Sequence, residues 1–343
     1  MQTVRIGRVG SAGALGAGVL GLAGCGGNGQ SSLQPASHQA HDIANLFWWM
    51  MGTAWVGLAA IVFLLVWAWR RQNRRGFGDD REGPKPGEKT SWYVVVGAGV
   101  ALPIALIAAL FVIANIFVIR TTQAPAANAT KLTVLVVGHM WWWEVHYPGH
   151  RVVTANEIHI PARTPVRLEV QTADVIHSFW VPQLNRTIDT IPGRTNAIEL
   201  YADHTGRYRG QCDEFCGLQH AHMAFFVFAD PPAVFRRWLA AQSQPARAPR
   251  TAAERAGLRE FLSGECSSCH TIRGTSATGN TGPDLTHLAS RTTLGSLTVP
   301  NTRDYLEGWI TRSQSVKPGN QMPDVAVSAR RLRELVAYLE GLR

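Results

Sequence analysis

The sequence predicts a multidomain membrane protein with three parts: a two-helix transmembrane hairpin, a β-sandwich or barrel, and an all-α C-terminal domain. Two long apolar runs without charges, both within the first 120 residues, predict the hairpin. Short strand-like segments after residue 130 predict the β-domain, and helical patterns separated by long loops follow residue 252. A chain of 343 residues is long enough to hold all three parts.

Residues 1–24 predict a lipoprotein-type export signal. Arg5 and Arg8 form a positive n-region, and a short apolar run of small residues follows them. The run ends in LAGC at Cys25, which resembles the bacterial lipobox, where the cysteine is lipidated and becomes the mature N-terminus. The alternative is an ordinary signal peptide with an incidental cysteine. In both cases residues 25–45 are predicted to be a periplasmic N-terminal segment.

Residues 46–69 and 92–119 are the predicted transmembrane helices. They contain 24 and 28 residues without a charge, and a spanning helix needs about 20. Pro103 predicts a kink in the second helix. The connecting loop, residues 70–91, carries seven arginines and lysines and is predicted to be cytoplasmic. The chain should therefore cross the bacterial cytoplasmic (inner) membrane twice, with both soluble domains on the periplasmic side.

Neither predicted span contains a histidine or a carboxylate. The spans therefore cannot hold a haem or a catalytic metal by themselves, and they are expected to anchor the chain or to dock onto a larger membrane partner. No nucleic acid is expected as a partner, because the β-domain carries equal numbers of basic and acidic side chains and its predicted location is outside the cell.

Residues 130–240 are predicted to fold as an antiparallel sandwich or barrel. The segments KLTVLVVG, MWWWEVHY, NEIHIPARTPVRLEV, TNAIELYA and AFFVFA are rich in β-branched and aromatic residues and are separated by turn signals. An amphipathic stretch, PAVFRRWLAA, follows the last of them. Residues 241–251 form a predicted linker to the C-terminal domain at 252–343.

The C-terminal domain contains the motif C-x-x-C-H at Cys266, Cys269 and His270. This motif attaches c-type haem through two thioether bonds, and the adjacent histidine ligates the iron. A redox-active or zinc-binding C-x-x-C is the alternative. Met322, 52 residues after His270 and the single methionine of this domain, can supply the second axial ligand. With its final helix-like segment, the domain resembles a class I cytochrome c with one covalent haem c.

The segment GQCDEFCGLQHAHM brings together Cys212, Cys216, His220 and Met223. In an oxidising compartment a disulfide is the first alternative to a metal site. Thiolate, imidazole and thioether donors favour copper over calcium or magnesium. Zinc is satisfied by two cysteines and two histidines, but it does not need the methionine. His177, in DVIHSFWVP, is the candidate second histidine.

The pattern C-x-E-x-C-x-x-x-H-x-x-M with an upstream His-Ser-Phe resembles the dinuclear copper centre (CuA) of cytochrome c oxidase subunit II. The resemblance covers roughly residues 40–240 and includes PQLNRTIDTIPGR, GRYRGQCDEFCG and GHMWWWEV. It implies two transmembrane helices followed by a cupredoxin-like Greek-key β-barrel. The fused cytochrome makes the chain resemble the caa-type haem–copper oxidases in particular.

The resemblance also implies a set of copper ligands. The two cysteines would bridge two coppers through their sulfurs, and each histidine would bind one copper. The thioether and one backbone carbonyl would be weak ligands, and the Glu214 carboxylate would reach a magnesium at the interface with subunit I. The implied copper ligands are His177, Cys212, Cys216, His220, Met223 and the carbonyl of Glu214.

The same resemblance bears on four further residues. Trp141 would lie beside the copper centre at the surface where electrons arrive, whereas His222 is expected to point elsewhere. Met140 stands where glutamine is more usual. Glu88 lies near the position of a proton-channel glutamate of some relatives, but its spacing to the second span differs by one residue, so it receives no role.

The resemblance implies subunit II of a respiratory cytochrome c oxidase. Electrons from an external donor, a soluble cytochrome or a bc complex, would pass through haem c and CuA to subunit I, which reduces oxygen and translocates protons. Subunits I and III are the implied partners, and this subunit itself holds no catalytic residue. One alternative is the electron-accepting subunit of a copper-containing nitric oxide reductase. An alternative of another class is a membrane-anchored copper carrier or chaperone.

Overall fold

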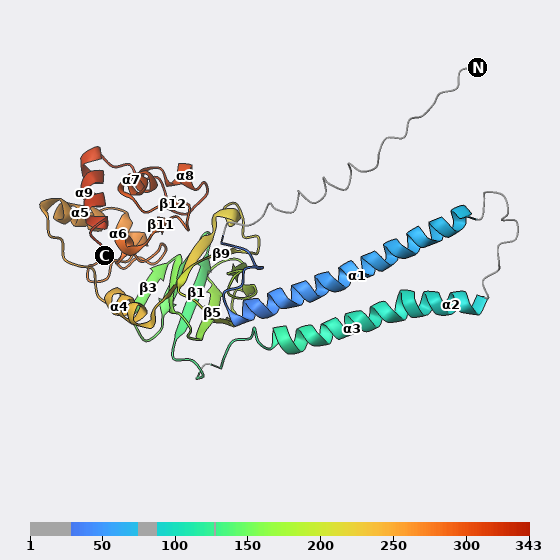
Figure 1. Cartoon of the computed structure of the whole chain (residues 1–343). Helices are drawn as coiled ribbons and strands as arrows, with labels where there is room; N and C mark the ends of the chain where they lie inside the picture. The colour runs from blue at the N-terminus through green and yellow to red at the C-terminus, as the bar shows by residue number, and fades with distance from the viewer. Residues whose placement is uncertain (1–28, 75–87, 127) are drawn as a thin grey trace, which may run out of the picture.

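The computed structural model describes residues 29–74, 88–126 and 128–343. The predicted export signal with Cys25, and most of the predicted cytoplasmic loop, lie outside these residues. Figure 1 shows a β-sandwich that lies between a pair of long helical rods and a helical C-terminal domain.

The first rod is the single helix α1 (His38–Arg74), which extends beyond the predicted span at both ends. The second rod contains α2 (Glu88–Val96) and α3 (Leu102–Ala114), together with two π-helical turns, η3 (Gly97–Ala101) and η4 (Asn115–Ile119). His38–Arg74 and Trp92–Ala114 are long and apolar enough to cross a membrane. The rods lie side by side, with η4 against α1.

Pro103 is accommodated by a local change of helix type. Proline has no N–H and cannot donate the usual i→i−4 hydrogen bond. The π-helical turn η3 ends just before this residue, and the N–H of Leu102 donates to the carbonyl of Gly97. The predicted kink is therefore a π-helical turn, after which α3 continues nearly along the line of α2 (Figure 1).

The first turn of α1 belongs to the soluble part of the molecule. Ser37 Oγ donates to the carbonyl of Leu184, and Gln39 Nε2 donates to Glu199 Oε1 at 2.6 Å. Gln39 and Ala40 are buried against the sandwich. These polar contacts explain why the helix begins eight residues before the predicted span.

Two five-stranded sheets form the sandwich. The first sheet has the order β3 (Val152–Ala155), β2 (Trp142–Tyr147), β1 (Thr133–His139), β5 (Val166–Thr172) and β8 (Asn196–Leu200). The second has the order β4 (Glu157–Pro161), β10 (Ala224–Asp230), β9 (Gly206–Cys212), β6 (His177–Trp180) and β7 (Ile188–Thr190). The predicted cupredoxin-like fold class is confirmed, but one detail was wrong. The pairs β1–β5 and β10–β4 are parallel, so the sheets are mixed rather than purely antiparallel.

Strand alternation builds the core between the sheets. Buried and partly exposed residues alternate along β1 and β2 with period two. The Trp143 ring is fully buried and meets Phe179 and Phe225 edge to face, with centroids 5.8 and 5.5 Å away. Each such buried aromatic side chain stabilises the fold by roughly 1.5–3 kcal/mol. This aromatic group lies directly beneath the end of the sandwich where the cysteine loop emerges.

The helix α4 (Pro232–Gln242) packs against β3, β4 and β10 at the end of the β-domain. The C-terminal domain begins with α5 (Ala252–Ser263) and ends with α9 (Ala329–Leu339). Between them lie α6 (Cys266–Cys269), η6 (Leu288–Ser290), α7 (Arg303–Thr311), α8 (Ser313–Val316) and the short strands β11 (Thr293–Leu294) and β12 (Val299–Pro300). Gly257 lets α5 and α9 touch, because a Cβ there would overlap the carbonyl of Glu334. The first and last helices of this domain therefore pack against each other.

The predicted linker packs onto the C-terminal domain. The N–H of Ala246 donates to the carbonyl of Arg273 at 2.9 Å, and Arg247 Nε donates to the carbonyl of Gly341 at 2.6 Å. Arg247 also forms an ion pair with Glu254 at 3.0 Å. The connection between the β-sandwich and the C-terminal domain is therefore held in place at several points.

Candidate metal and haem centres

The cysteine-containing loop connects the adjacent strands β9 and β10. Cys212 is the last residue of β9, the 3-10 turn η5 (His220–His222) follows, and Ala224 begins β10. His177 begins β6, which pairs with β9 through Phe179 opposite Cys212. Sheet pairing thus brings a histidine from 35 residues upstream to the same end of the sandwich.

Five side chains from this region form a compact, soft donor set. His177, Cys212, Cys216 and Met223 are buried, and His220 is partly buried. The sulfurs of Cys212 and Cys216 are 3.8 Å apart. Nδ1 of His177 lies 3.9 Å from the Cys212 sulfur, and Nδ1 of His220 lies 3.6 Å from the Cys216 sulfur. The Met223 sulfur lies 3.8 Å from that of Cys216, and the Glu214 carbonyl oxygen lies 3.2 Å from the Cys212 sulfur.

This geometry suits a metal site better than a disulfide. A disulfide needs a sulfur–sulfur distance of about 2.05 Å, and both thiols are free. Two sulfurs that each bind a shared metal at about 2.3 Å can lie up to roughly 4.6 Å apart, so the observed 3.8 Å suits such sharing. A buried thioether beside two thiols and two imidazoles is a donor set for copper rather than for a hard cation.

The hydrogen bond between the two cysteines shifts their pKa values in opposite directions. The hydrogen bond from the Cys216 thiol lowers the pKa of Cys212 to about 4, with burial opposing it and His177 assisting. The same thiolate raises the pKa of Cys216 well above its usual range. Because metal coordination deprotonates a thiol outright, a bound cation would convert this thiol–thiolate pair into two thiolates.

Asp174 orients His177 and was missed in the sequence. Its Oδ1 accepts a hydrogen bond from Nε2 of His177 at 2.8 Å, which leaves Nδ1 directed toward Cys212. Burial disfavours the charged imidazole, but the interactions of His177 with Asp174 and Cys212 together outweigh burial and raise the pKa of His177. Asp174 also accepts from the N–H of Met140 at 2.7 Å. The D-x-x-H spacing in DVIHSFW was the available signal.

Trp141 lies against the cysteine-containing loop, in the turn between β1 and β2. Its indole Nε1 donates to the carbonyl of Cys216 at 2.9 Å, and its ring packs on Gly217. Because it precedes β2, it does not share a strand face with Trp143. The Glu214 side chain is exposed. Nδ1 of His222 is paired with Gln219 Oε1 at 2.8 Å rather than with either sulfur.

The C-x-x-C-H motif occupies the short helix α6 and the residue after it. Cys266 and Cys269 are partly buried, free thiols at the two ends of this turn. Nδ1 of His270 donates to the carbonyl of Pro283 at 2.8 Å, and Gly282 packs against the imidazole ring. Burial lowers the pKa of His270, which favours the neutral form that ligates metals. These features fit a haem-ligating histidine with a fixed tautomer.

Met322 packs against the same hydrophobic cluster as Cys266. Its N–H donates to Asn320 Oδ1 at 2.8 Å, and its carbonyl accepts from Ser313 Oγ at 2.6 Å and Gln314 Nε2 at 2.7 Å. The backbone around this thioether is therefore fixed by three hydrogen bonds, as an axial ligand of a low-reorganisation haem requires.

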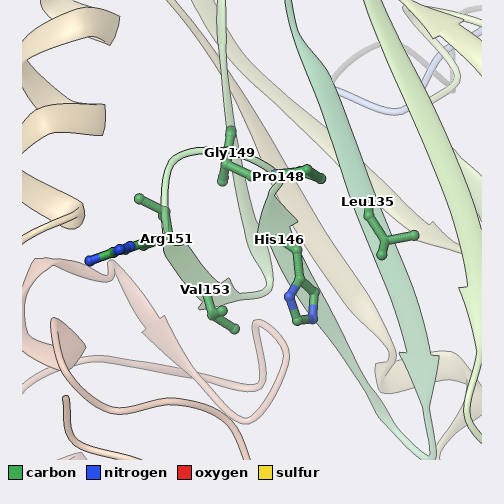
Figure 2. A pocket seen from close by; sticks show the side chains of 8 residues that line it. Leu135, His146, Pro148, Gly149, Arg151 and Val153 are labelled. Atoms are coloured by element: carbon green, nitrogen blue, oxygen red, sulfur yellow. The ribbon is translucent and has the colours of Figure 1, made fainter. Parts of the chain in front are cut away.

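A shallow depression of about 430 Å³ lies away from both centres, beside the turn between β2 and β3. Figure 2 shows His146 and Arg151 projecting from this hairpin at its edge. None of the predicted copper or haem ligands lines it. It is an open surface feature, so the chemistry of the described residues lies in the cysteine loop and the C-x-x-C-H turn.

Comparisons with known proteins identify both soluble domains. Residues 149–229 match the family described as cytochrome C oxidase subunit II, periplasmic domain, and residues 255–343 match cytochrome c. Cytochrome c oxidase subunit 2 of Alkalihalophilus pseudofirmus is 30% identical over 318 residues, which cover 91% of each chain. The Bacillus subtilis protein of the same name is 27% identical over 223 residues, 62% of each chain.

A solved structure is also similar in sequence. The periplasmic domain of subunit II of cytochrome oxidase from Bradyrhizobium japonicum is 30% identical, with a TM-score of 0.33. The match covers 35% of this chain and 96% of that one. The match to the Alkalihalophilus protein spans both soluble domains and the helical hairpin. The chain therefore belongs to the cytochrome c oxidase subunit 2 family, in a form that carries a C-terminal cytochrome c domain.

Proposed function

We propose that this chain relays single electrons from a covalent haem c, through a dinuclear CuA centre, to subunit I of a respiratory haem–copper oxidase. Oxygen would be reduced to water in that partner, coupled to proton translocation. Family membership establishes a membrane-anchored electron-transfer subunit with a periplasmic domain, as part of an oxidase complex. The observation that carries the finer assignment is the buried set of two thiols, two imidazoles and one thioether around the Cys212–Cys216 pair.

In this proposal each copper-site residue has a defined task. Cys212 and Cys216 hold both coppers between their sulfurs, and His177 and His220 each hold one. Met223 and the carbonyl of Glu214 complete the set as weak ligands. Bound copper supplies a one-electron carrier whose charge change is spread over two ions. The β-strands that end at the loop keep these donors in one geometry, so that little has to move when an electron passes.

Cys266 and Cys269 would attach haem c, with His270 and Met322 as its axial ligands. The carbonyl of Pro283 fixes the His270 tautomer, and the hydrogen bonds around Met322 hold its backbone. A thioether ligand raises the iron potential, which suits a haem that receives electrons from a soluble cytochrome or a bc complex and passes them inward.

The remaining assignments belong to the assembled complex. The exposed Glu214 carboxylate would reach a magnesium at the interface with subunit I, and subunit III would be a further partner. The two helical rods would cross the bacterial inner membrane, with residues 70–91 in the cytoplasm. Cys25 would carry the lipid anchor after removal of residues 1–24. Residues 130–240 would form the copper domain and residues 252–343 the haem domain, joined by 241–251.

Purification of the native complex through a tag on this chain tests the proposal. We expect subunit I of a haem–copper oxidase to co-purify, and the complex to consume oxygen with reduced cytochrome as donor. A complex that reduces nitric oxide but takes up no oxygen would contradict the oxidase assignment. A chain that purifies without a catalytic subunit and releases a single, labile copper would instead support a copper carrier.

A further inference from the structure

Lys317 is a buried cation at the contact between the haem domain and the copper domain. Its side chain is 2% exposed although it stands in the loop that follows α8. Its Nζ donates three hydrogen bonds to carbonyl oxygens, to Trp141 at 2.8 Å, to His222 at 2.8 Å and to Gly295 at 2.9 Å. The first two acceptors belong to the copper domain and the third to the haem domain.

These three carbonyl oxygens satisfy all three donors of an ammonium group. Burial lowers the pKa of Lys317 to about 7, although the nearby Cys216 acts to raise it. Removing an ammonium charge from water is costly unless every donor finds a partner. A lysine that served only as a surface group would not be placed here. Its position is explained if it joins the two domains.

The loop that begins at Lys317 also contacts Leu218 and Gln219, which follow Cys216 in the cysteine-containing loop. Gln219 Nε2 donates to the carbonyl of Pro318 at 2.8 Å. Gly319 approaches so closely that a Cβ there would lie 2.7 Å from Leu218 and 3.9 Å from the Trp141 ring. Trp141 is therefore partly covered by the haem domain and remains only partly exposed.

The same loop leads directly to the predicted axial ligand of the haem. Asn320 Nδ2 donates to the carbonyl of Lys317 at 2.7 Å, and Asn320 Oδ1 accepts from the N–H of Met322 at 2.8 Å. A short, hydrogen-bonded segment thus connects the buried ammonium to Met322. Any shift of Lys317 relative to Trp141 would move this segment relative to the copper site.

A second set of hydrogen bonds extends the contact between the haem domain and the copper domain. Ser296 Oγ donates to the carbonyl of Ala224 at 2.6 Å. The N–H and hydroxyl of Thr292 both donate to Glu157 Oε1, at 2.6 and 2.5 Å. The haem domain is therefore docked on the sandwich through several hydrogen bonds, in addition to its covalent connection through residues 241–251.

We infer that Lys317 is a positioning residue that locks the Met322 loop over Trp141 and so fixes the path from haem c to the copper centre. The inference rests on the proposed function and deepens it. One consequence is that an external donor reduces the haem of this chain, because the haem domain already occupies part of the Trp141 surface that would receive a soluble cytochrome.

The test uses the whole oxidase complex and the variant Lys317→Met, which removes the ammonium and keeps most of the side-chain length. The matched control is Arg330→Met, which removes a cation whose side chain is 83% exposed on α9. Fast photoreduction of haem c, followed by optical detection of copper reduction, gives the internal transfer rate. Hydrogen exchange of residues 317–322 reports the docking directly.

Losing even one hydrogen bond to a charged group costs about a factor of ten in an equilibrium constant, and Lys317→Met removes three. We therefore expect Lys317→Met to slow transfer by at least about tenfold and to speed exchange of this loop by a similar factor. The haem spectrum, the haem potential and the copper EPR signal should stay unchanged, and Arg330→Met should behave as wild type. A wild-type rate together with wild-type exchange in Lys317→Met overturns the inference.

If Lys317→Met fails to retain both cofactors, Ser296→Ala tests the same contact between the two domains. Ser296 belongs to neither predicted ligand set. Slower transfer with normal cofactor spectra supports the inference, and unchanged transfer and exchange reject it. Failure of the proposed function would give a distinguishable result. In that case the wild-type complex itself would show no electron transfer from haem to copper.

Discussion

The indole N–H of Trp141 donates a hydrogen bond to the carbonyl oxygen of Cys216 at 2.9 Å. Through this bond the turn before β2 is joined to the loop that holds the copper-site thiols. Trp141 is also touched by the haem-domain loop, through the carbonyl bonded to Lys317 and the ring close to Gly319. Trp141 thus contacts both the loop that holds the thiols and the loop that leads to Met322.

Trp141→Phe should slow electron arrival at copper while leaving the copper spectrum in place. The ring remains, but the hydrogen bond to Cys216 is lost, which should lower the free energy of unfolding by about 1 kcal/mol. Trp142→Phe is the control, because Trp142 stacks on His139 at 4.3 Å and makes no such bond to the loop. Equal transfer rates in the two variants, measured after photoreduction of haem c, would argue against a role for Trp141.

Cys216→Ser should remove or convert the mixed-valence two-copper EPR signal and leave haem c intact. The Cys216 sulfur lies within 4 Å of the sulfurs of Cys212 and Met223 and of the His220 nitrogen, so its loss affects the whole donor set. His222→Ala is the control, since the ring of His222 is paired with a glutamine instead. An unaltered EPR spectrum in the serine variant rejects the bridging assignment.

Asp174→Asn should weaken copper binding by about 10–100-fold, the usual effect of losing a partner that orients a metal ligand. The amide keeps the shape of the carboxylate but removes the charge that holds Nε2 of His177 at 2.8 Å. Copper retention against a competing chelator measures the change. Asp203→Asn, at a carboxylate that pairs with His41 far from the loop, should retain copper as wild type does. Equal retention in both variants would show that Asp174 does not support the site.

Met322→Ala should abolish the sulfur-to-iron charge-transfer band and lower the haem potential, because a thioether ligand raises it. The haem should remain attached through Cys266 and Cys269. Met140→Ala, a methionine outside the haem domain, is the control and should leave the haem spectrum unchanged. Persistence of the band in Met322→Ala would mean that another residue is the axial ligand.

Glu144 gives the sandwich a predictable pH dependence. Burial alone would raise the pKa of Glu144, but hydrogen bonds from His139 and His146 prevail and lower it from 4.5 to about 2. A carboxyl group whose pKa is lower in the folded state stabilises the fold above its unfolded pKa, and this contribution fades as pH falls through the folded value. Glu144→Gln should therefore reduce the free energy of unfolding at pH 7. The difference from wild type should shrink between about pH 4.5 and 2 in denaturant titrations of the solubilised chain. A difference that is constant with pH would contradict this origin.

Much of the architecture was predictable because its signals are local. The strands with β-branched and aromatic alternation were predicted close to their observed positions, whereas β3, β6, β7 and β9 were not. These strands are short or polar, and β9 contains Gly210, whose hydrogen side chain leaves room for the Phe225 ring. The parallel pairs β1–β5 and β10–β4 depend on which strands meet in space, and no local pattern encodes that.

The functional residues also differ in how far the sequence predicts them. Four of the predicted copper ligands lie within a dozen residues of one another, so the sequence alone indicates a metal site. They are Cys212, Cys216, His220 and Met223. The burial of Lys317 could not be predicted from the sequence, because a lysine before Pro-Gly-Asn is typical of an exposed loop. Its burial results from carbonyl groups of three separate segments, which only the packed domains bring together.

The most direct test of the central claim is metal and haem analysis of the purified complex, combined with EPR of the oxidised copper site in this subunit. The account predicts two coppers and one covalent haem c per chain, with a mixed-valence signal from the coppers. A Cys212–Cys216 disulfide, or zinc in place of the two coppers, would contradict it.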